Sequence, residues 1–120
     1  MQTDSEIRDA LDIWRQAITA AVRRDAPDLS ARQMAILLTV YLTPPPHTVR
    51  GLARELNISK PAVSRALDAM GRHKLLKRKR DEKDRRSVLV QPTMTGMAYL
   101  GEYARDVRAA LRQKLSDAES

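Results

Sequence analysis

The segment Thr48–Met70 reads TVRGLARELNISKPAVSRALDAM and predicts two short helices joined by a sharp turn. Apolar residues recur at helical spacing in its first half, at Val49, Leu52, Ala53 and Leu56. Asn57 follows them, and asparagine can end a helix tightly because it adopts the left-handed backbone conformation more readily than most residues. Ser59 is expected to cap the second helix, with Pro61 in the first turn, where its missing N–H costs no hydrogen bond.

The second predicted helix has one apolar and one polar face. Its apolar positions span about 100° of the helix surface and are Val63, Ala66, Leu67 and Met70. The opposite face carries Pro61, Arg65, Asp68 and Arg72, with Ala62 and Ser64 on its flanks. This layout is typical of a helix-turn-helix whose second helix lies in the DNA major groove, although an ordinary pair of core helices would share the spacing.

The composition limits the class of protein. A chain of 120 residues with 42% hydrophobic and 31% charged residues is expected to form one helix-rich domain, residues 1–120. It contains no cysteine, which excludes disulfides and thiol catalysis. It also has no long apolar run and no signal-peptide pattern, so we expect a cytoplasmic protein that does not enter a membrane.

The positive charge is concentrated after the helix-turn-helix. The formal net charge of the whole chain is +7. Residues 72–92 carry nine basic and three acidic groups, a net charge of +6, whereas residues 1–28 carry four basic and six acidic groups, a net charge of −2. A localised basic patch attracts polyanions, so a nucleic acid is the expected partner.

Helices are expected on both sides of this region. Residues 4–24 carry an apolar stripe of Ile7, Leu11, Trp14, Ile18 and Val22. A capping box at Ser30 opens a helix through about Leu42, in which the side chains expected to be buried are Met34, Ile36, Leu37, Leu38, Val40 and Tyr41. Residues 93–117 form the last predicted helix, with the stripe Met97, Leu100, Ala104, Val107, Leu111 and Leu115. A monomer would leave the first and last stripes uncovered, so these two helices are expected to form a homodimer.

Residues 75–91 are predicted to form a β-hairpin with a charged tip, because two strand-like runs flank the segment Asp81–Arg86. A hairpin attached to a helix-turn-helix is a wing, whose tip can follow DNA phosphates or enter the minor groove. The predicted fold class is therefore mainly α with a small β-hairpin. It is a winged helix-turn-helix, with residues 48–72 as the helix-turn-helix, dimerising through its N- and C-terminal helices.

The order of these motifs over about residues 30–115 resembles the MarR (multiple antibiotic resistance regulator) family of transcription regulators, which are winged helix-turn-helix dimers. Family members carry an Asp-x-Arg motif in the wing, then a strand ending in Leu-Thr, then a Gly three residues after that Thr. The matching residues here are Asp84-Arg85-Arg86, Val88-Leu89-Val90, Pro92-Thr93 and Gly96. The resemblance implies that Arg86 or Arg85 reaches the minor groove, with Asp84 holding it in place.

Three features depart from the family pattern. Pro92 stands where Leu is usual, so the last hydrogen bond of its strand is expected to be missing. Lys74 stands where Gly is usual, so His73 or Lys74 is expected to adopt a strained backbone conformation. The C-terminal segment is shorter than in many members, which implies a smaller dimer interface.

Each candidate DNA contact has an expected role. Arg65 is expected to bind guanine O6 and N7, while Pro61, Ala62 and Ser64, beside the capping Ser59, meet neighbouring bases. Cationic side chains expected to contact phosphates are Arg50, Arg54, Lys60, Lys77 and Lys79. We therefore predict a sequence-specific transcription regulator, a repressor, that binds a pseudo-palindromic site on double-stranded DNA as a homodimer.

Catalysis is not supported by the sequence. His47 and His73 lie in no metal-ligand spacing and no Gly-rich phosphate loop is present, so we predict neither an enzyme nor a metal or cofactor. Two alternatives stay open: a winged-helix module that docks on an acidic protein, and a non-specific binder that grips double-stranded RNA by shape. The resemblance also implies a small-molecule effector, and Trp14, Met34 and Tyr41 could line its space, although core packing is the simpler interpretation.

Overall fold

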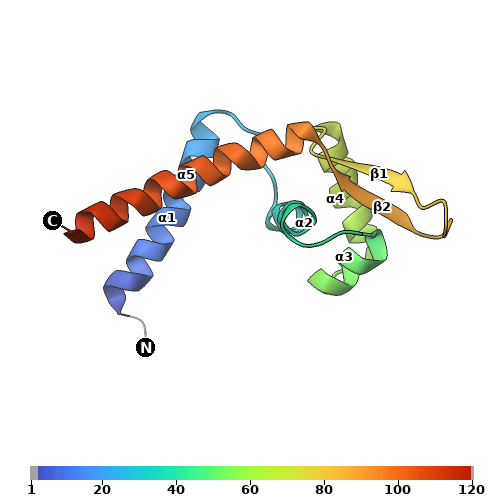
Figure 1. Cartoon of the computed structure of the whole chain (residues 1–120), viewed down its shortest axis with the longest axis horizontal. Coiled ribbons are helices and arrows are strands. Elements are labelled where there is room, and N and C mark those ends of the chain that lie inside the picture. The colour runs from blue at the N-terminus through green and yellow to red at the C-terminus, as the bar shows by residue number, and fades with distance from the viewer. Residues whose placement is uncertain (1–2, 120) are drawn as a thin grey trace. The chain divides into compact units, whose positions relative to one another are not determined.

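The computed structural model describes residues 3–119, which form five helices and one two-stranded sheet. The elements in chain order are α1 (Asp4–Arg23), α2 (Ala31–Leu42), α3 (Val49–Leu56), α4 (Lys60–Arg72), β1 (Leu76–Arg80), β2 (Val88–Pro92) and α5 (Met94–Glu119) (Figure 1). The chain divides into two compact units, one comprising residues 29–98 and the other the segments on either side of them. This element order confirms the predicted mainly α fold with a small β-hairpin.

The turn between α3 and α4 follows from its local sequence. Asn57 ends α3 in the left-handed region, with φ of 54° and ψ of 47°. Ser59 caps α4, and its side-chain oxygen accepts a hydrogen bond from the backbone N–H of Ala62 at 3.2 Å. Pro61 lies in the first turn of α4, as predicted. Because a helix cap of this kind contributes about 1 kcal/mol, these few residues fix where α3 ends and α4 begins.

The core of the 29–98 unit surrounds α2, which contacts α3, α4 and β2. The fully buried large side chains of the described chain all belong to this unit and are Ile36, Leu37, Leu52, Val63, Leu67, Met70 and Leu75. Burying one such side chain stabilises the fold by about 1.5–3 kcal/mol. The predicted burial of Leu38 is wrong, because its side chain is 38% exposed. Leu38 lies about 200° around the helix from Ile36, away from the surfaces that α2 packs against.

β1 and β2 form the predicted hairpin, in an antiparallel register that pairs Leu76 with Pro92 and Arg78 with Val90. Pro92 is thus the last residue of β2. Because no strand residue follows it, its missing N–H does not interrupt the hydrogen bonds between the two strands. An additional bridge joins Thr48 to Leu89, and the backbone N–H of Val90 donates to His47 O at 2.8 Å. The three prolines before His47 predict only a stiff spacer. The sequence therefore gives no sign that His47 and Thr48 pair with β2.

The second unit comprises α1 and most of α5. Small side chains, including Ala17, Ala21 and Ala110, are buried in this unit. Arg24 forms ion pairs with Glu102 at 2.5 Å and with Asp106 at 2.8 Å. The hydrogen bond from Lys114, at 2.8 Å, holds the pKa of the Asp12 carboxyl well below its usual range. Ion pairs therefore help to fix how α1 and α5 pack against each other.

The large apolar side chains of α1 and α5 remain outside this packing. Trp14 is 63% exposed, and the other exposed members of the two stripes are Ile7, Leu11, Ile18, Val22, Met97, Val107, Leu111 and Leu115. A single copy of the chain therefore leaves both predicted stripes uncovered, as expected. None of the helices within residues 3–119 combines the length and the apolar character that crossing a bilayer requires.

Candidate nucleic-acid interface

The face of α4 opposite the core carries the side chains that could read a base. Because Val63, Ala66, Leu67 and Met70 are buried, the residues between them are turned outward. Lys60, Pro61 and Arg65 are exposed, and Ser64 is half-buried. The Arg65 guanidinium forms no ion pair or hydrogen bond with any residue in the described range 3–119. Its donors are therefore available to an external acceptor.

Ala62 does not belong to this exposed face. Its side chain is only 8% exposed, so Ala62 offers little surface to a base. Ala62 lies one helical turn before the buried Ala66, on the side of α4 that is covered. The sequence predicts Ala62 at the edge between the polar and apolar faces of α4. At such an edge, a small apolar side chain can be either exposed or buried.

Exposed cationic side chains lie on α3 and at the start of α4. Arg50 and Arg54 lie four residues apart on α3, and both are exposed. Lys60 is the first residue of α4 and is exposed beside the capping Ser59. The N-terminus of a helix itself attracts anions through its free N–H groups, so this end of α4 suits a phosphate group.

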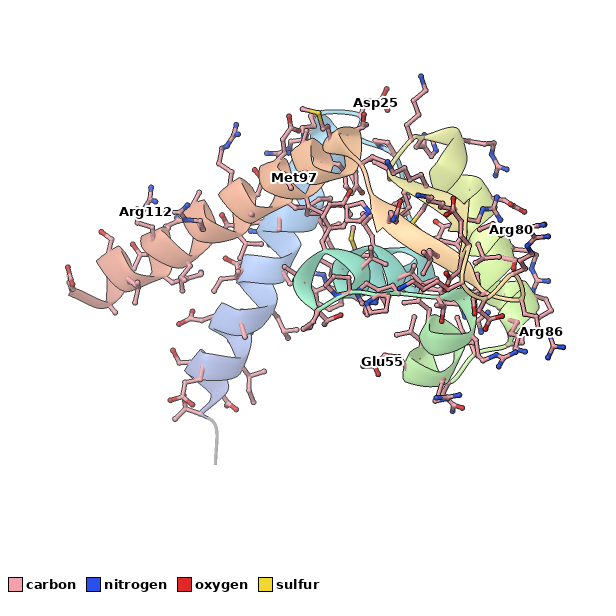
Figure 2. All side chains as sticks on the ribbon, turned by 45° about the vertical axis from the view of Figure 1, so that its right-hand side comes forward. Asp25, Glu55, Arg80, Arg86, Met97 and Arg112 are labelled. Atoms are coloured by element: carbon pink, nitrogen blue, oxygen red, sulfur yellow. The ribbon has the colours of Figure 1, made fainter. Side chains whose placement is uncertain are left out.

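The hairpin presents different cations on its two faces. Leu76 and Val90 are buried, and alternate residues of a strand share a face, so Arg78 and Arg80 lie on the side that meets the core. Lys77 and Lys79, the predicted phosphate contacts, lie on the opposite side. Figure 2 shows the Arg80 side chain extending away from the ribbon at the end of β1. The sequence motifs do not assign Arg78 and Arg80 to either face of the hairpin. Counting every second residue from the buried Leu76 would have placed both on the same face as Leu76.

Arg78 joins the hairpin to α4. Its guanidinium forms an ion pair with the Asp68 carboxylate at 2.6 Å, and both side chains are substantially exposed. A solvent-exposed pair of this kind contributes only about 0–1 kcal/mol to stability. Its effect is to orient the hairpin beside the helix, which agrees with the contacts between α4 and β1.

The tip of the wing is organised by Asp84. Its carboxylate accepts hydrogen bonds from the backbone N–H of Arg86 at 3.1 Å and from the hydroxyl of Ser87 at 3.3 Å. Arg85 and Arg86 are both exposed, and Arg86 points away from the ribbon in Figure 2. Asp84 thus fixes the backbone that carries these arginines and makes no ion pair with either guanidinium among the described residues.

The link from α4 to β1 runs through a left-handed residue, and the expected strain falls on Lys74. Its φ is 59°, whereas His73 has an ordinary φ of −91°. The backbone N–H of Lys74 donates to Gly71 O at 3.0 Å, and that of Leu75 donates to Met70 O at 2.9 Å. These two bonds end α4 and turn the chain into the hairpin.

The three residues that could line an effector site, Trp14, Met34 and Tyr41, stay a prediction from the resemblance. Trp14 belongs to one unit, and Met34 and Tyr41 belong to the other. The Tyr41 hydroxyl is already bonded to the backbone of Leu75 and Thr93. An open cavity of about 480 Å³ lies on α1 and α5, and its lining includes polar residues such as Arg23 and Gln113 but none of these three.

A helix-turn-helix followed by a basic hairpin, with a free arginine on the outer face of the second helix, defines a winged helix-turn-helix protein. A sequence model of the MarR family matches residues 28–87, which is half of the 120 residues. The chain belongs to the MarR family of transcription regulators. Its proteins are transcription factors and not enzymes, which agrees with the predicted absence of catalysis.

Solved structures share this fold at low sequence identity. S. aureus MepR in complex with DNA gives a TM-score of 0.74 and 20% identity, covering 92% of this chain and 87% of that chain. The transcriptional regulator Tm0710 from Thermotoga maritima gives 0.75 and 18%, covering 90% and 73%. The transcriptional regulator BldR from Sulfolobus solfataricus gives 0.61 and 25%, covering 98% and 87%. No curated protein matches the sequence significantly.

Proposed function

We propose that this MarR-family regulator binds a specific sequence in double-stranded DNA and represses transcription as a homodimer. The observation that carries the proposal is the exposed, unpaired Arg65 at the centre of the outer face of α4. An arginine in that position can donate two hydrogen bonds to guanine O6 and N7 in the major groove. Pro61 and Ser64 lie on the same part of α4 and would meet the neighbouring bases.

The surrounding cations would position the protein without selecting a sequence. Arg50 and Arg54 are exposed on α3 and Lys60 is exposed at the start of α4, and these three side chains would bind phosphate groups. Lys77 and Lys79 would do the same from the outer face of the hairpin. Arg86 or Arg85 would enter the minor groove, where a narrow groove concentrates negative potential, with Asp84 holding the backbone N–H of Arg86. The structurally similar S. aureus MepR forms a complex with DNA, which supports DNA as the partner.

The uncovered stripes of α1 and α5 support a homodimer. Segments 4–24 and 93–117 would form the dimer interface, because exposed apolar side chains on this scale are unfavourable in water. A two-fold dimer carries two copies of α4, so its DNA site would be pseudo-palindromic, with half-sites about 10 bp apart. A small-molecule effector is not included in this proposal, because the Tyr41 hydroxyl is satisfied by the backbone.

A gel-shift experiment at about physiological salt, with excess non-specific competitor DNA, tests this proposal against the alternatives. We expect the wild-type protein to retain a subset of a random duplex pool. Arg65→Ala should bind this subset more weakly and should discriminate less between sequences. Arg112→Ala, which removes the same charge from an exposed position on α5, should bind the subset as the wild type does. Retention of no duplex would favour a protein-interaction module. Equal retention of every DNA and RNA duplex would favour non-specific binding by shape.

A further inference from the structure

The hydroxyl of Tyr41, near the end of α2, lies at the base of the wing. It is 3.0 Å from Leu75 O and 2.9 Å from Thr93 O, and it accepts a hydrogen bond from the backbone N–H of Thr93 at 3.0 Å. A phenol has one proton, so it donates to one of the two carbonyls at a time while it accepts from Thr93. Leu75 directly precedes β1 and Thr93 directly follows β2. One side chain of α2 therefore fastens both ends of the hairpin.

The Thr93 side chain closes the same junction. Its hydroxyl donates to Lys74 O at 2.6 Å, and it accepts a hydrogen bond from the backbone N–H of Gly96 at 2.9 Å. Thr93 thereby caps α5 and at the same time binds Lys74, the left-handed residue that leads into β1. The start and the end of the wing are joined through this hydroxyl.

The Tyr41 hydroxyl occupies the space that a side chain at Gly96 would need. A Cβ at this position would lie 2.0 Å from the Tyr41 oxygen and 2.2 Å from Leu75 O. Both distances are far below van der Waals contact, and Leu75 O is a backbone atom that a rotamer change cannot move. Any larger residue would therefore displace the hydroxyl, the base of β1 or the start of α5.

We infer that Tyr41, Thr93 and Gly96 form a wing anchor that sets the direction of the hairpin, and that Tyr41 is a positioning residue for DNA binding. This inference rests on the proposed function, because it acts through the wing arginines. A five-residue strand spans about 17 Å, so a rotation of about 10° at its base moves its far end by about 3 Å. That displacement exceeds the tolerance of a hydrogen bond, and it would take Arg85 and Arg86 out of reach of the groove.

The test is a double-mutant cycle between Tyr41→Phe and the pair Arg85→Ala/Arg86→Ala, measured as affinity for the selected duplex. We expect Tyr41→Phe alone to weaken binding by about three- to tenfold, the range of one lost hydrogen bond. In the protein that already lacks the wing arginines, the same substitution should have almost no further effect on affinity. A purely structural role would give the same fold-change in both backgrounds, and this result would overturn the inference.

Two matched controls separate positioning from general destabilisation. Tyr99→Phe also removes a hydroxyl that bonds a backbone carbonyl, Pro27 O at 3.1 Å, and it should leave DNA affinity unchanged. Gly96→Ala should weaken DNA binding, whereas Gly101→Ala, where an added Cβ meets nothing within 4 Å, should not. If Gly96→Ala fails to fold, Tyr41→Phe still decides the question, because it removes one atom and adds none.

The outcomes also distinguish this inference from the proposed function. Failure of the wild-type protein to bind any duplex would overturn both. Specific binding that depends on the wing arginines, combined with full affinity in Tyr41→Phe, would overturn the wing anchor alone and leave the proposed function in place.

Discussion

At the scale of single residues, Lys74 shows how the junction before the wing departs from an ordinary backbone. Its φ of 59° is a conformation that costs a residue with a Cβ about 1–2 kcal/mol. The backbone N–H groups of Lys74 and Leu75 donate to Gly71 O and Met70 O, so the chain cannot relax without opening the end of α4. The surrounding hydrogen bonds therefore hold Lys74 in this strained conformation.

Lys74→Gly is expected to stabilise the protein by up to about 1 kcal/mol, because glycine adopts positive φ freely while losing more entropy on folding. The measurement is the midpoint of chemical denaturation. His73→Gly is the matched control. Because His73 has an ordinary φ of −91°, glycine relieves no strain there and should only lower the stability of the protein. A lower stability of Lys74→Gly would show that the Lys74 side chain itself makes a stabilising contact.

Arg65→Ala belongs to the same scale. Because Arg65 is unpaired on the outer face of α4, its removal should cost about 1–3 kcal/mol of binding free energy on the preferred site and relax the preference at one base position. Binding titrations on a set of single-base variants measure both effects. An equal loss on all sequences would identify Arg65 as a phosphate contact.

At the scale of elements, the wing combines a fixed base with a charged tip. Replacing Arg85 and Arg86 together by Ala should flatten the salt dependence of DNA binding, since each phosphate contact contributes nearly one unit to the slope of log K against log salt. Arg108→Ala/Arg112→Ala, which removes two exposed charges from α5 that form no ion pair among residues 3–119, should leave the slope unchanged. An unaltered slope in the wing variant would mean that the tip does not contact DNA.

The elements differ in how far the sequence predicts them. Caps and turn residues such as Asn57, Ser59 and Thr93 act locally, so both the helix-turn-helix and the start of α5 could be located correctly. Burial depends on partners that are distant in sequence, and for this reason Leu38 and Ala62 were misplaced. The role of Tyr41 could not be predicted, because the backbone groups that its hydroxyl bonds lie 34 and 52 positions away in the sequence.

At the scale of the whole molecule, the uncovered stripes lead to a prediction about assembly. Trp14→Glu should convert a dimer into a monomer and lower affinity for the preferred duplex, because a charge would be buried between the copies. Leu42→Glu is the control, since Leu42 is also highly exposed but lies on α2 outside both stripes. Sedimentation at micromolar concentration gives the mass. A wild-type protein that is already monomeric, or a Trp14→Glu variant that remains dimeric, would refute this interface.

Selection of bound sequences from a random duplex library tests DNA binding, symmetry and spacing together. The enriched sequences are expected to contain two half-sites related by a two-fold axis, with centres about 10 bp apart. The same selection with Arg65→Ala should lose the preference at one position in each half-site. Enrichment of no sequence, or of one asymmetric motif that is identical for both proteins, would contradict the proposal that two copies of α4 read the duplex.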